Sequence, residues 1–343
     1  MATLATQFNE ALTNVEPAED VKNAIKAHST VRKVLTKDER LKKLGIDPIL
    51  IGSYRRHVSI RRIKDVDVFA RLSEADTSLR PGEILDHVLD VLEEAFPGAV
   101  KRQRRSVKVE FEGYDLSVDV VIARPCADHP EDHWQIPERI EDDGDATWVE
   151  TNPTRMTEFS TEANKSFLLD EGDEDSGVYV PTVKLIRQIR RTWVKDHPGG
   201  FYVEVLTLQA FNDLSPKETT VAAYLTKVLR GVADGLPAAA VDGLEDPTLE
   251  GNIISTKASD EELEEAADCM AGAADLAEDA LGERSVCKAA VKWRKLFGTT
   301  KHTTEEEHVF PLPEFCNADG TEKGSRRITS GASAVPAGSD RYA

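Results

Sequence analysis

The sequence predicts an α+β fold in which a mixed sheet with covering helices is followed by a helical second lobe. Short apolar runs rich in β-branched residues are confined to residues 49–123, whereas after residue 179 apolar residues recur every three or four positions, as on one face of a helix. A chain of 343 residues is also long enough to form two lobes, each with its own core.

We place the boundary between the lobes at residue 178. The first lobe, residues 1–178, holds the N-terminal helices and the sheet, and the helical lobe, residues 179–316, begins with a central helix at 179–196. We expect the active site in the cleft between them. From residue 317 onward Gly, Ser, Ala and charged residues follow one another without a period, which predicts a flexible tail over 317–343.

Each element follows from its local pattern. Residues 1–45 are expected to be mainly helical with a break near Pro17, and Pro81 begins a helix that ends at Pro97. Strands are expected on both sides of the Gly-Ser turn within residues 49–72, and at 99–102, 107–111 and 116–123. Residues 126–177 are expected to be surface loops with a short helix at 156–167. Amphipathic helices are expected at 201–214, 219–229, 259–281 and 286–297.

The composition limits the classes of partner. A formal net charge of −19 argues against a sequence-independent binder of long nucleic acid, because such binding depends on neutralising phosphates, but it permits a small nucleotide in a local basic cleft. Four cysteines lie far apart without metal-ligand spacing, so we expect single buried thiols at Cys126, Cys269, Cys287 and Cys316. With no signal-like N-terminus and no membrane-length apolar stretch, we expect a cytoplasmic monomer without membrane contact.

The strongest chemical signal is an Asp-x-Asp motif at the start of a strand. Alternation along the strand places Asp65 and Asp67 on one face, and Val66 and Val68 on the other. Two neighbouring carboxylates repel each other unless a cation lies between them. Hard oxygen ligands of this kind suit Mg²⁺, which fills the rest of its shell with water and substrate phosphates.

A third carboxylate, Asp119, interrupts the apolar strand expected at residues 116–123. A charge there is costly unless it is paired or bound to a metal. An outward-facing aspartate on a half-exposed strand is the ordinary explanation. Beside the pair at Asp65 and Asp67 we favour a third metal ligand, because two-metal phosphoryl transfer commonly takes a carboxylate from a neighbouring strand.

Two further features are candidates for phosphate binding. Gly52 and Ser53 precede a helix start and offer backbone N–H groups and a hydroxyl. Lys184 lies nearest the start of a basic stripe on the central helix, which continues through Arg187, Arg191 and Lys195. A solvated basic face explains this stripe as well as a phosphate contact does, and both interpretations stay open.

These motifs resemble the nucleotidyltransferases of the DNA polymerase β superfamily, in which Gly-Ser is followed after about a dozen residues by Asp-x-Asp. Within it, Gly-Ser-Tyr-Arg-Arg-His followed by Lys-Asp-Val-Asp-Val resembles the CD-NTases, the bacterial cyclic oligonucleotide synthases related to cyclic GMP–AMP synthase, which belong to the CBASS anti-phage systems. Weaker similarity continues to about residue 315, at Pro181–Ile186, Val203–Leu206, Asp246-Pro247 with Gly251-Asn252, and Trp293–Gly298.

The resemblance implies an enzyme that condenses ribonucleoside triphosphates, ATP or another, into a cyclic di- or oligonucleotide second messenger and releases pyrophosphate. It implies two Mg²⁺ ions, for which Mn²⁺ substitutes, and CBASS regulatory proteins or proteins conjugated to the C-terminus as partners. It assigns metal binding and catalysis to Asp65, Asp67 and Asp119, and phosphate binding to Gly52, Ser53 and Lys184.

Other functions on the same fold stay open, namely nucleotidyl transfer to an RNA end or to a small molecule, and a non-catalytic nucleotide-binding partner. The acidic surface disfavours an RNA acceptor, and the presence of all three carboxylates disfavours a non-catalytic protein. The chain departs from many relatives at Val58, where they carry threonine, and at Gly200, where they carry a serine expected near the triphosphate.

Overall fold

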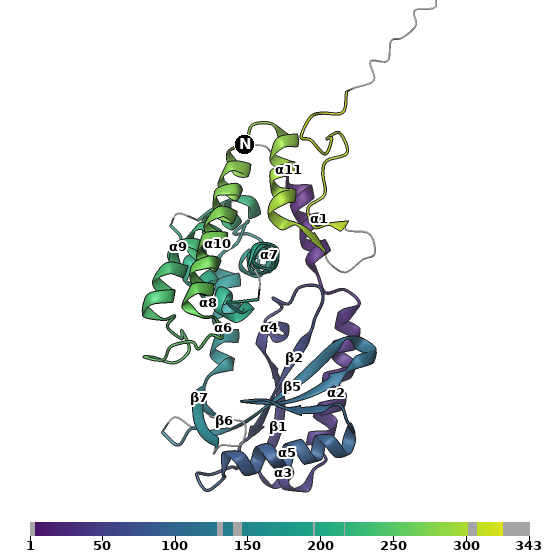
Figure 1. Cartoon of the computed structure of the whole chain (residues 1–343), viewed down its shortest axis with the longest axis vertical. Helices are drawn as coiled ribbons and strands as arrows, with labels where there is room; N and C mark the ends of the chain where they lie inside the picture. Colours follow the sequence, from purple (N-terminus) through teal and green to yellow (C-terminus); the bar gives the residue numbers. More distant parts are fainter. Residues whose placement is uncertain are drawn as a thin grey trace, which may run out of the picture.

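A mixed sheet builds the first lobe, and a bundle of helices lies above it (Figure 1). In the computed structural model the described residues are 4–128, 133–139, 146–194, 196–215, 217–300 and 307–324. Among these residues the large sheet has seven strands in the order β1-β2-β5-β4-β3, with the β6–β7 hairpin continuing from the end of β5. The strands are β1 (Ile46–Ile51), β2 (Asp65–Leu72), β3 (Val100–Arg102), β4 (Val107–Phe111), β5 (Leu116–Pro125), β6 (Trp134–Arg139) and β7 (Ala146–Thr151).

Only one pair in this sheet, β2 with β5, is parallel among the described residues. The side chains of Val66, Val68, Val118 and Val120 point to the face covered by α2 (Asp20–Leu35) and α5 (Pro81–Ala95), where they form a buried core. Because side chains alternate along a strand, the opposite face of β2 and β5 carries the polar residues. That face is where the site lies.

The β6–β7 hairpin is a difference from prediction, because residues 126–177 were expected to be loops. Its side chains form a small second core on the polar face of the sheet, where Ile136 packs with Phe69 and Ala123. In this hairpin polar and apolar residues alternate over only a few positions. The sequence pattern that predicts a strand is therefore weak here.

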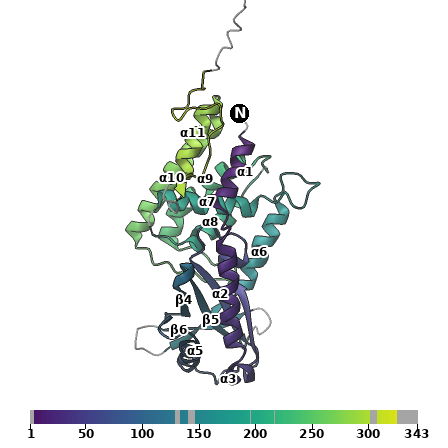
Figure 2. The same ribbon diagram turned by 90° about the vertical axis from the view of Figure 1, so that its right-hand side faces the viewer.

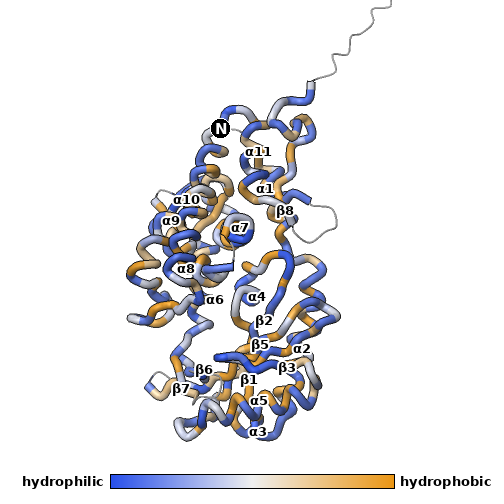
Figure 3. The backbone as a smooth tube through the Cα atoms, in the orientation of Figure 1, coloured by the Kyte–Doolittle hydropathy of each residue, from blue (hydrophilic) through white to orange (hydrophobic). Residues whose placement is uncertain are grey.

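The central helix α7 (Tyr179–Trp193) holds the helical lobe together, as the sequence predicts. It is seen end-on in Figure 1 and contacts α1, α6, α8, α9, α10 and α11. The other helices are α6 (Pro153–Ser166), α8 (Gly200–Asn212), α9 (Val221–Asp242), α10 (Asp260–Gly282) and α11 (Val286–Phe297). Hydrophilic and apolar residues alternate along α9 and α10 in Figure 3, as expected of helices with one buried face.

The predicted boundary of the first lobe, 1–178, needs correction at both ends. The helix α1 (Ala5–Val15) packs on the helical lobe, where the ring of Phe8 lies 5.0 Å from Trp293 and 5.1 Å from Phe310 between centroids. Figure 2 shows α1 beside the helical lobe and α2 below it, along the sheet. Because α2 and α5 already cover the apolar face of the sheet, the apolar side of α1 is buried on the other lobe; α6 joins the same core through Met156.

Two predictions about the C-terminal part also change. Cys287 and Cys316 form a disulfide that ties the segment after β9 (Glu307–His308) to α11, so the expectation of single thiols is wrong for this pair, while Cys126 is a buried thiol. The chain stays ordered beyond residue 317, since Asn317 N–H donates to the Thr321 carbonyl at 2.8 Å. The rest of the predicted tail, 325–343, lies outside the described residues.

The remaining elements are short: α3 (Glu39–Lys43), α4 (Gly52–Arg55), a 3-10 turn at Glu112–Tyr114, and β8 (Thr299–Thr300), which pairs with β9. None of the helices in the described ranges combines the length and the apolar composition of a membrane span.

Candidate active site

The parallel register of β2 and β5 brings the three predicted aspartates together. Asp67 is the direct partner of Asp119, and Asp65 is the partner of Ser117, two residues before Asp119. Paired residues in parallel strands point to the same face, so all three carboxylates lie on the face opposite α2 and α5. Asp65 is exposed, whereas Asp67 and Asp119 are half-buried.

The pKa of Asp67 shows how closely these charges interact. It is raised from 3.8 to about 7, first by burial and then by the negative charges of Asp65 and Asp119. Two guanidinium groups, those of Arg56 and Arg187, act in the opposite direction without cancelling the effect. The site therefore holds more negative charge than its own cations balance.

The residues fit a divalent cation. Burial raises the pKa of Asp119 to about 6, although Lys108 on the neighbouring strand lowers it. The Oδ1 atom of Asp119 is buried and has no hydrogen-bond partner among the described residues, which is costly for a carboxylate unless a cation satisfies it. Among the described residues no three Asp, Glu, His or Cys side chains already lie in a geometry that could hold a metal ion.

Gly52 allows the turn after β1 to approach the aspartates. Ile51 pairs with Asp67 across β1 and β2, and Gly52 follows with a φ of 72°, a region that favours glycine. A Cβ at Gly52 would lie 1.9 Å from Oδ2 of Asp67, so a side chain there would collide with the carboxylate. Ser53 comes next, and its hydroxyl lies 3.0 Å from that of Ser59.

A buried ion pair joins this turn to the helical lobe, and sequence analysis missed it. Arg56, directly after α4, donates from Nε to Oε1 of Glu204 at 2.7 Å and from Nη2 to Oε2 at 3.0 Å. Arg187 on α7 donates to the same Oε2 at 3.4 Å. The side chain of Glu204 is fully buried on α8. The sequence does hold a signal for this ion pair, because Glu204 is a lone carboxylate in the apolar run Phe201–Leu208. As for Asp119, a charge in an apolar segment is costly unless it is paired.

Lys184 is placed differently from the aspartates. Its amine forms an ion pair with Glu16, at the C-terminal end of α1, and it lines a small cavity with Tyr54 and Ser59. The predicted contact of Lys184 with phosphates therefore requires this ion pair to open. Arg191, from the same stripe, donates to the Arg61 carbonyl, and Lys195 lies outside the described residues.

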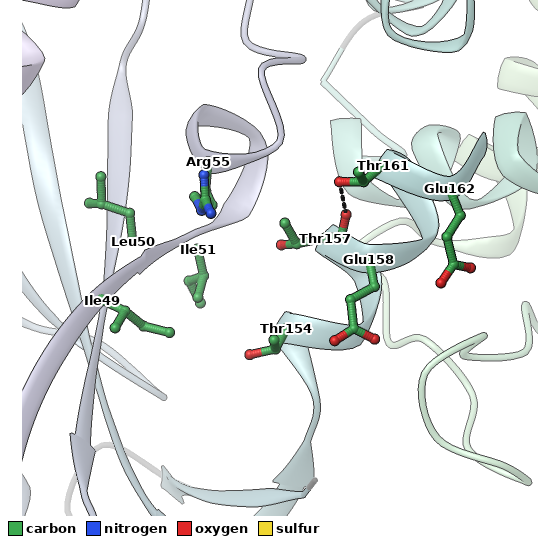
Figure 4. A pocket seen from close by; sticks show the side chains of 9 residues that line it. All are labelled: Ile49, Leu50, Ile51, Arg55, Thr154, Thr157, Glu158, Thr161 and Glu162. Carbon is green, nitrogen blue, oxygen red and sulfur yellow. Dashed lines mark hydrogen bonds between the residues drawn. The ribbon is translucent and has the colours of Figure 1, made fainter. Parts of the chain in front are cut away.

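A cavity of about 460 Å³ opens between the sheet lobe and α6 (Figure 4). Residues Ile49–Ile51 and Arg55 line one wall, and α6 lines the other with Thr154, Thr157, Glu158, Thr161 and Glu162. Of the lining residues, Ile51 is the register partner of Asp67, but none of the three aspartates lines the cavity.

Comparisons with known proteins agree with this geometry. Residues 1–164 match the Second Messenger Oligonucleotide or Dinucleotide Synthetase domain. A cyclic AMP-AMP-AMP synthase from an Acinetobacter strain is 27% identical over 312 residues, covering 86% of this chain and 84% of the relative. The chain is therefore similar to the CD-NTases, the family that includes these synthases.

Solved CD-NTases share its fold. Escherichia coli MS115-1 CdnC with ATP superposes with a TM-score of 0.62 at 17% identity, covering 86% of this chain and 98% of CdnC. Bradyrhizobium diazoefficiens CdnG with GTP gives a TM-score of 0.65 at 16% identity, covering 84% and 96%. CdnC has also been solved in complex with a HORMA protein, with a TM-score of 0.61 at 18% identity, covering 86% and 96%. These matches confirm the predicted polymerase β-like core with a helical lobe.

Proposed function

We propose that this protein acts as a CD-NTase, condensing ribonucleoside triphosphates into a cyclic di- or oligonucleotide second messenger and releasing pyrophosphate. The observation that carries the proposal is the parallel register of Asp67 with Asp119, which brings three carboxylates beside the Gly52 turn and leaves Oδ1 of Asp119 without a partner. The relative named cyclic AMP-AMP-AMP synthase and the solved relatives with ATP and GTP support the same substrates.

In each transfer an acceptor ribose hydroxyl attacks the α-phosphorus of a second nucleotide. The new P–O bond forms as the bond to pyrophosphate breaks, and the hydroxyl proton passes to Asp119 or through water to solvent. The work of the protein is to hold the two groups in line and to balance negative charge. A second transfer closes the ring or extends the oligomer.

Asp65, Asp67 and Asp119 would hold two Mg²⁺ ions, or Mn²⁺ in their place. Such ions neutralise phosphate charge and lower the pKa of a bound hydroxyl. Gly52, which no other residue can replace without touching Asp67, lets the backbone of α4 approach the terminal phosphates, and the Ser53 hydroxyl follows it. The 460 Å³ cavity beside Ile51 is large enough to admit part of a nucleotide.

The cellular setting is part of the proposal. A CBASS anti-phage role, a cytoplasmic location and a regulatory or conjugated protein partner rest on the family resemblance, and the complex of CdnC with a HORMA protein supports the partner.

One experiment tests the function. The pure protein is incubated with the four labelled ribonucleoside triphosphates and Mg²⁺ or Mn²⁺, then treated with phosphatase. Phosphatase-resistant products identified by mass spectrometry as cyclic nucleotides are the expected result. If every mixture yields only free phosphate, with and without a HORMA protein, the proposal fails and acceptor-dependent transfer or plain nucleotide binding takes its place.

A further inference from the structure

The turn at Gly52 and Ser53 continues into a segment that is held mainly by the helical lobe. Residues 53–61, here called the α4 segment, follow Gly52, and in Figure 1 their helix α4 lies between the sheet and the helices above it. The hydroxyls of Ser53 and Ser59, 3.0 Å apart, join the two halves of the segment. Tyr54 packs against the core beneath the sheet, but the other anchors of the segment lie elsewhere.

The strongest of these anchors is the ion pair of Arg56 with Glu204 on α8. Two hydrogen bonds of 2.7 and 3.0 Å join the guanidinium to both carboxylate oxygens, and the two side chains are 4% and 0% exposed. The Arg56 guanidinium also lies 5.6 Å from the ring centroid of Phe201, on the same helix. A buried ion pair adds little net stability compared with apolar packing, but its two parallel hydrogen bonds fix a distance and an orientation. The end of α4 is therefore held in a defined position against α8.

The far end of the α4 segment is tied to the same lobe. The Arg61 N–H donates to the carbonyl of Val15, the last residue of α1, at 2.8 Å, and the Arg61 carbonyl accepts a hydrogen bond from Arg191 on α7. Val58 and Ile60 are buried in the core of the helical lobe, the same core that holds α1. In the described part of the chain, hydrogen bonds leave the segment only toward α1 and the residue after it, α7 and α8. The segment therefore follows the helical lobe, although in the sequence it lies between two strands of the sheet.

The turn before this segment has no free space on its other side. A Cβ at Gly52 would lie 1.9 Å from Oδ2 of Asp67, so the backbone is already against the carboxylate. Gly52 and Ser53 are also the groups that we assign to the terminal phosphates. A displacement of about 1 Å at a site can cost about a hundredfold in rate, so the position of this turn matters for the reaction.

We propose that the helical lobe sets the position of this turn beside Asp67, and that Glu204 and Arg56 are the positioning residues that do so. The inference rests on the proposed function for the role of the turn in phosphate binding. A shift of α8 relative to the sheet is passed through the ion pair to Arg56, and from there along the four residues of α4 to the turn. Neither Glu204 nor Arg56 touches the substrate in this scheme, because both act through the backbone of the turn.

Hydrogen exchange read by mass spectrometry tests the anchoring without any ligand. The full-length wild type is compared with Glu204→Gln, which keeps the shape of the side chain and removes its charge, and with Arg56→Lys, which keeps the charge and removes the planar fork. In both variants the amides of residues 53–61 are expected to exchange roughly ten- to a hundredfold faster, while those of β4 and β5 do not change. Glu278→Gln is the matched control, because it removes the same charge from a guanidinium pair inside the helical lobe, where Arg230 donates to Glu278 at 2.7 Å. It is expected to leave the exchange of residues 53–61 unchanged.

Calorimetric titration with a non-hydrolysable ATP analogue and Mg²⁺ tests the effect on the site. Glu204→Gln is expected to weaken binding roughly tenfold at unchanged stoichiometry, whereas a purely structural role would lower the fraction of binding-competent protein and leave the affinity unchanged. Because Glu204 also contacts Arg187, a double-mutant cycle with Arg56→Gln identifies the route, and Glu204→Gln is expected to add little once Arg56 is replaced. Equal effects in both backgrounds would overturn the positioning role of Arg56. Thermal unfolding shows which variants are folded, and Arg56→Lys carries both readouts if Glu204→Gln is not.

The outcomes separate this inference from the proposed function. If residues 53–61 exchange no faster in Glu204→Gln than in Glu278→Gln, or if β4 and β5 accelerate as much, the inference fails even when the wild type makes cyclic products. If the segment loosens but the affinity for the analogue is unchanged, the ion pair is structural only and the inference also fails. If the segment loosens and binding weakens but the wild type makes no product, the inference stands and the proposed function fails. If the wild type does not bind the analogue, both fail.

Discussion

Asp67→Asn is expected to stabilise the metal-free protein increasingly as the pH rises. The pKa of Asp67 rises from 3.8 to about 7 in the folded chain. One pKa unit corresponds to about 1.4 kcal/mol, so keeping this carboxylate ionised inside the fold costs about 4 kcal/mol. Asparagine has nearly the same shape and carries no charge, so it avoids this cost.

The sign follows from the raised pKa. Well below the ordinary pKa of 3.8 the carboxyl is protonated in both the folded and the unfolded chain, and the substitution is expected to change stability little. As the pH rises toward 7, the unfolded chain releases this proton while the folded chain retains it, so the wild type loses stability that the variant keeps. The advantage of Asp67→Asn is expected to grow by about 2–3 kcal/mol between about pH 5 and about pH 8.

Urea unfolding of both proteins in EDTA, at several pH values, measures this difference. The difference in unfolding free energy between variant and wild type cancels the contributions of all groups whose titration the substitution does not change. Asp90→Asn, at an exposed position on α5, is the control and is expected to show no such growth. If the stability difference for Asp67→Asn is flat across this range, or falls as the pH rises, the crowding of charge described at the site is wrong.

Three further predictions concern the surroundings of the site. Glu204→Ala leaves the buried guanidinium of Arg56 and the partly buried one of Arg187 without their carboxylate. It is expected to destabilise the protein by about 3–5 kcal/mol in urea unfolding. A loss below about 1 kcal/mol would mean that the ion pair of Arg56 and Glu204 is not buried. Gly52→Ala is expected to abolish product formation with far less effect on thermal unfolding than on rate, because its Cβ would lie 1.9 Å from Asp67; near-normal turnover would refute the close approach. Cys287→Ser removes a disulfide between residues 29 apart and is expected to lower the free energy of unfolding by about 2–4 kcal/mol under oxidising conditions. Once dithiothreitol has reduced the wild type, the substitution is expected to have no effect. If the variant and the wild type are equally stable in both conditions, the disulfide does not form.

The three aspartates could be predicted because their pattern is one that a shared cation explains better than chance exposure does. Asp65 and Asp67 share a face through strand alternation alone, and Asp119 is a charge in an apolar strand. The register that makes Asp67 and Asp119 direct partners was not predictable, since it joins residues 52 positions apart through a crossover.

The contacts between lobes could not be predicted either. Arg56 and Glu204 are 148 residues apart, and neither sequence segment shows which partner the other finds. The placement of α1 follows from competition for a surface: its apolar side resembles that of α2, and only the packed sheet shows that α2 and α5 leave no room for it. The disulfide could not be predicted for the same reason. Its two cysteines are distant in the sequence and form no motif, and they meet only because the folded chain returns to α11.

The central claim is that Asp65, Asp67 and Asp119 share divalent ions beside a triphosphate. Anomalous diffraction from crystals grown with Mn²⁺ and a non-hydrolysable ATP analogue measures it directly. We expect manganese peaks among these three carboxylates, with the α-phosphate of the analogue next to them. Manganese elsewhere in the cleft, with the Asp119 carboxylate still without a partner, would contradict the claim.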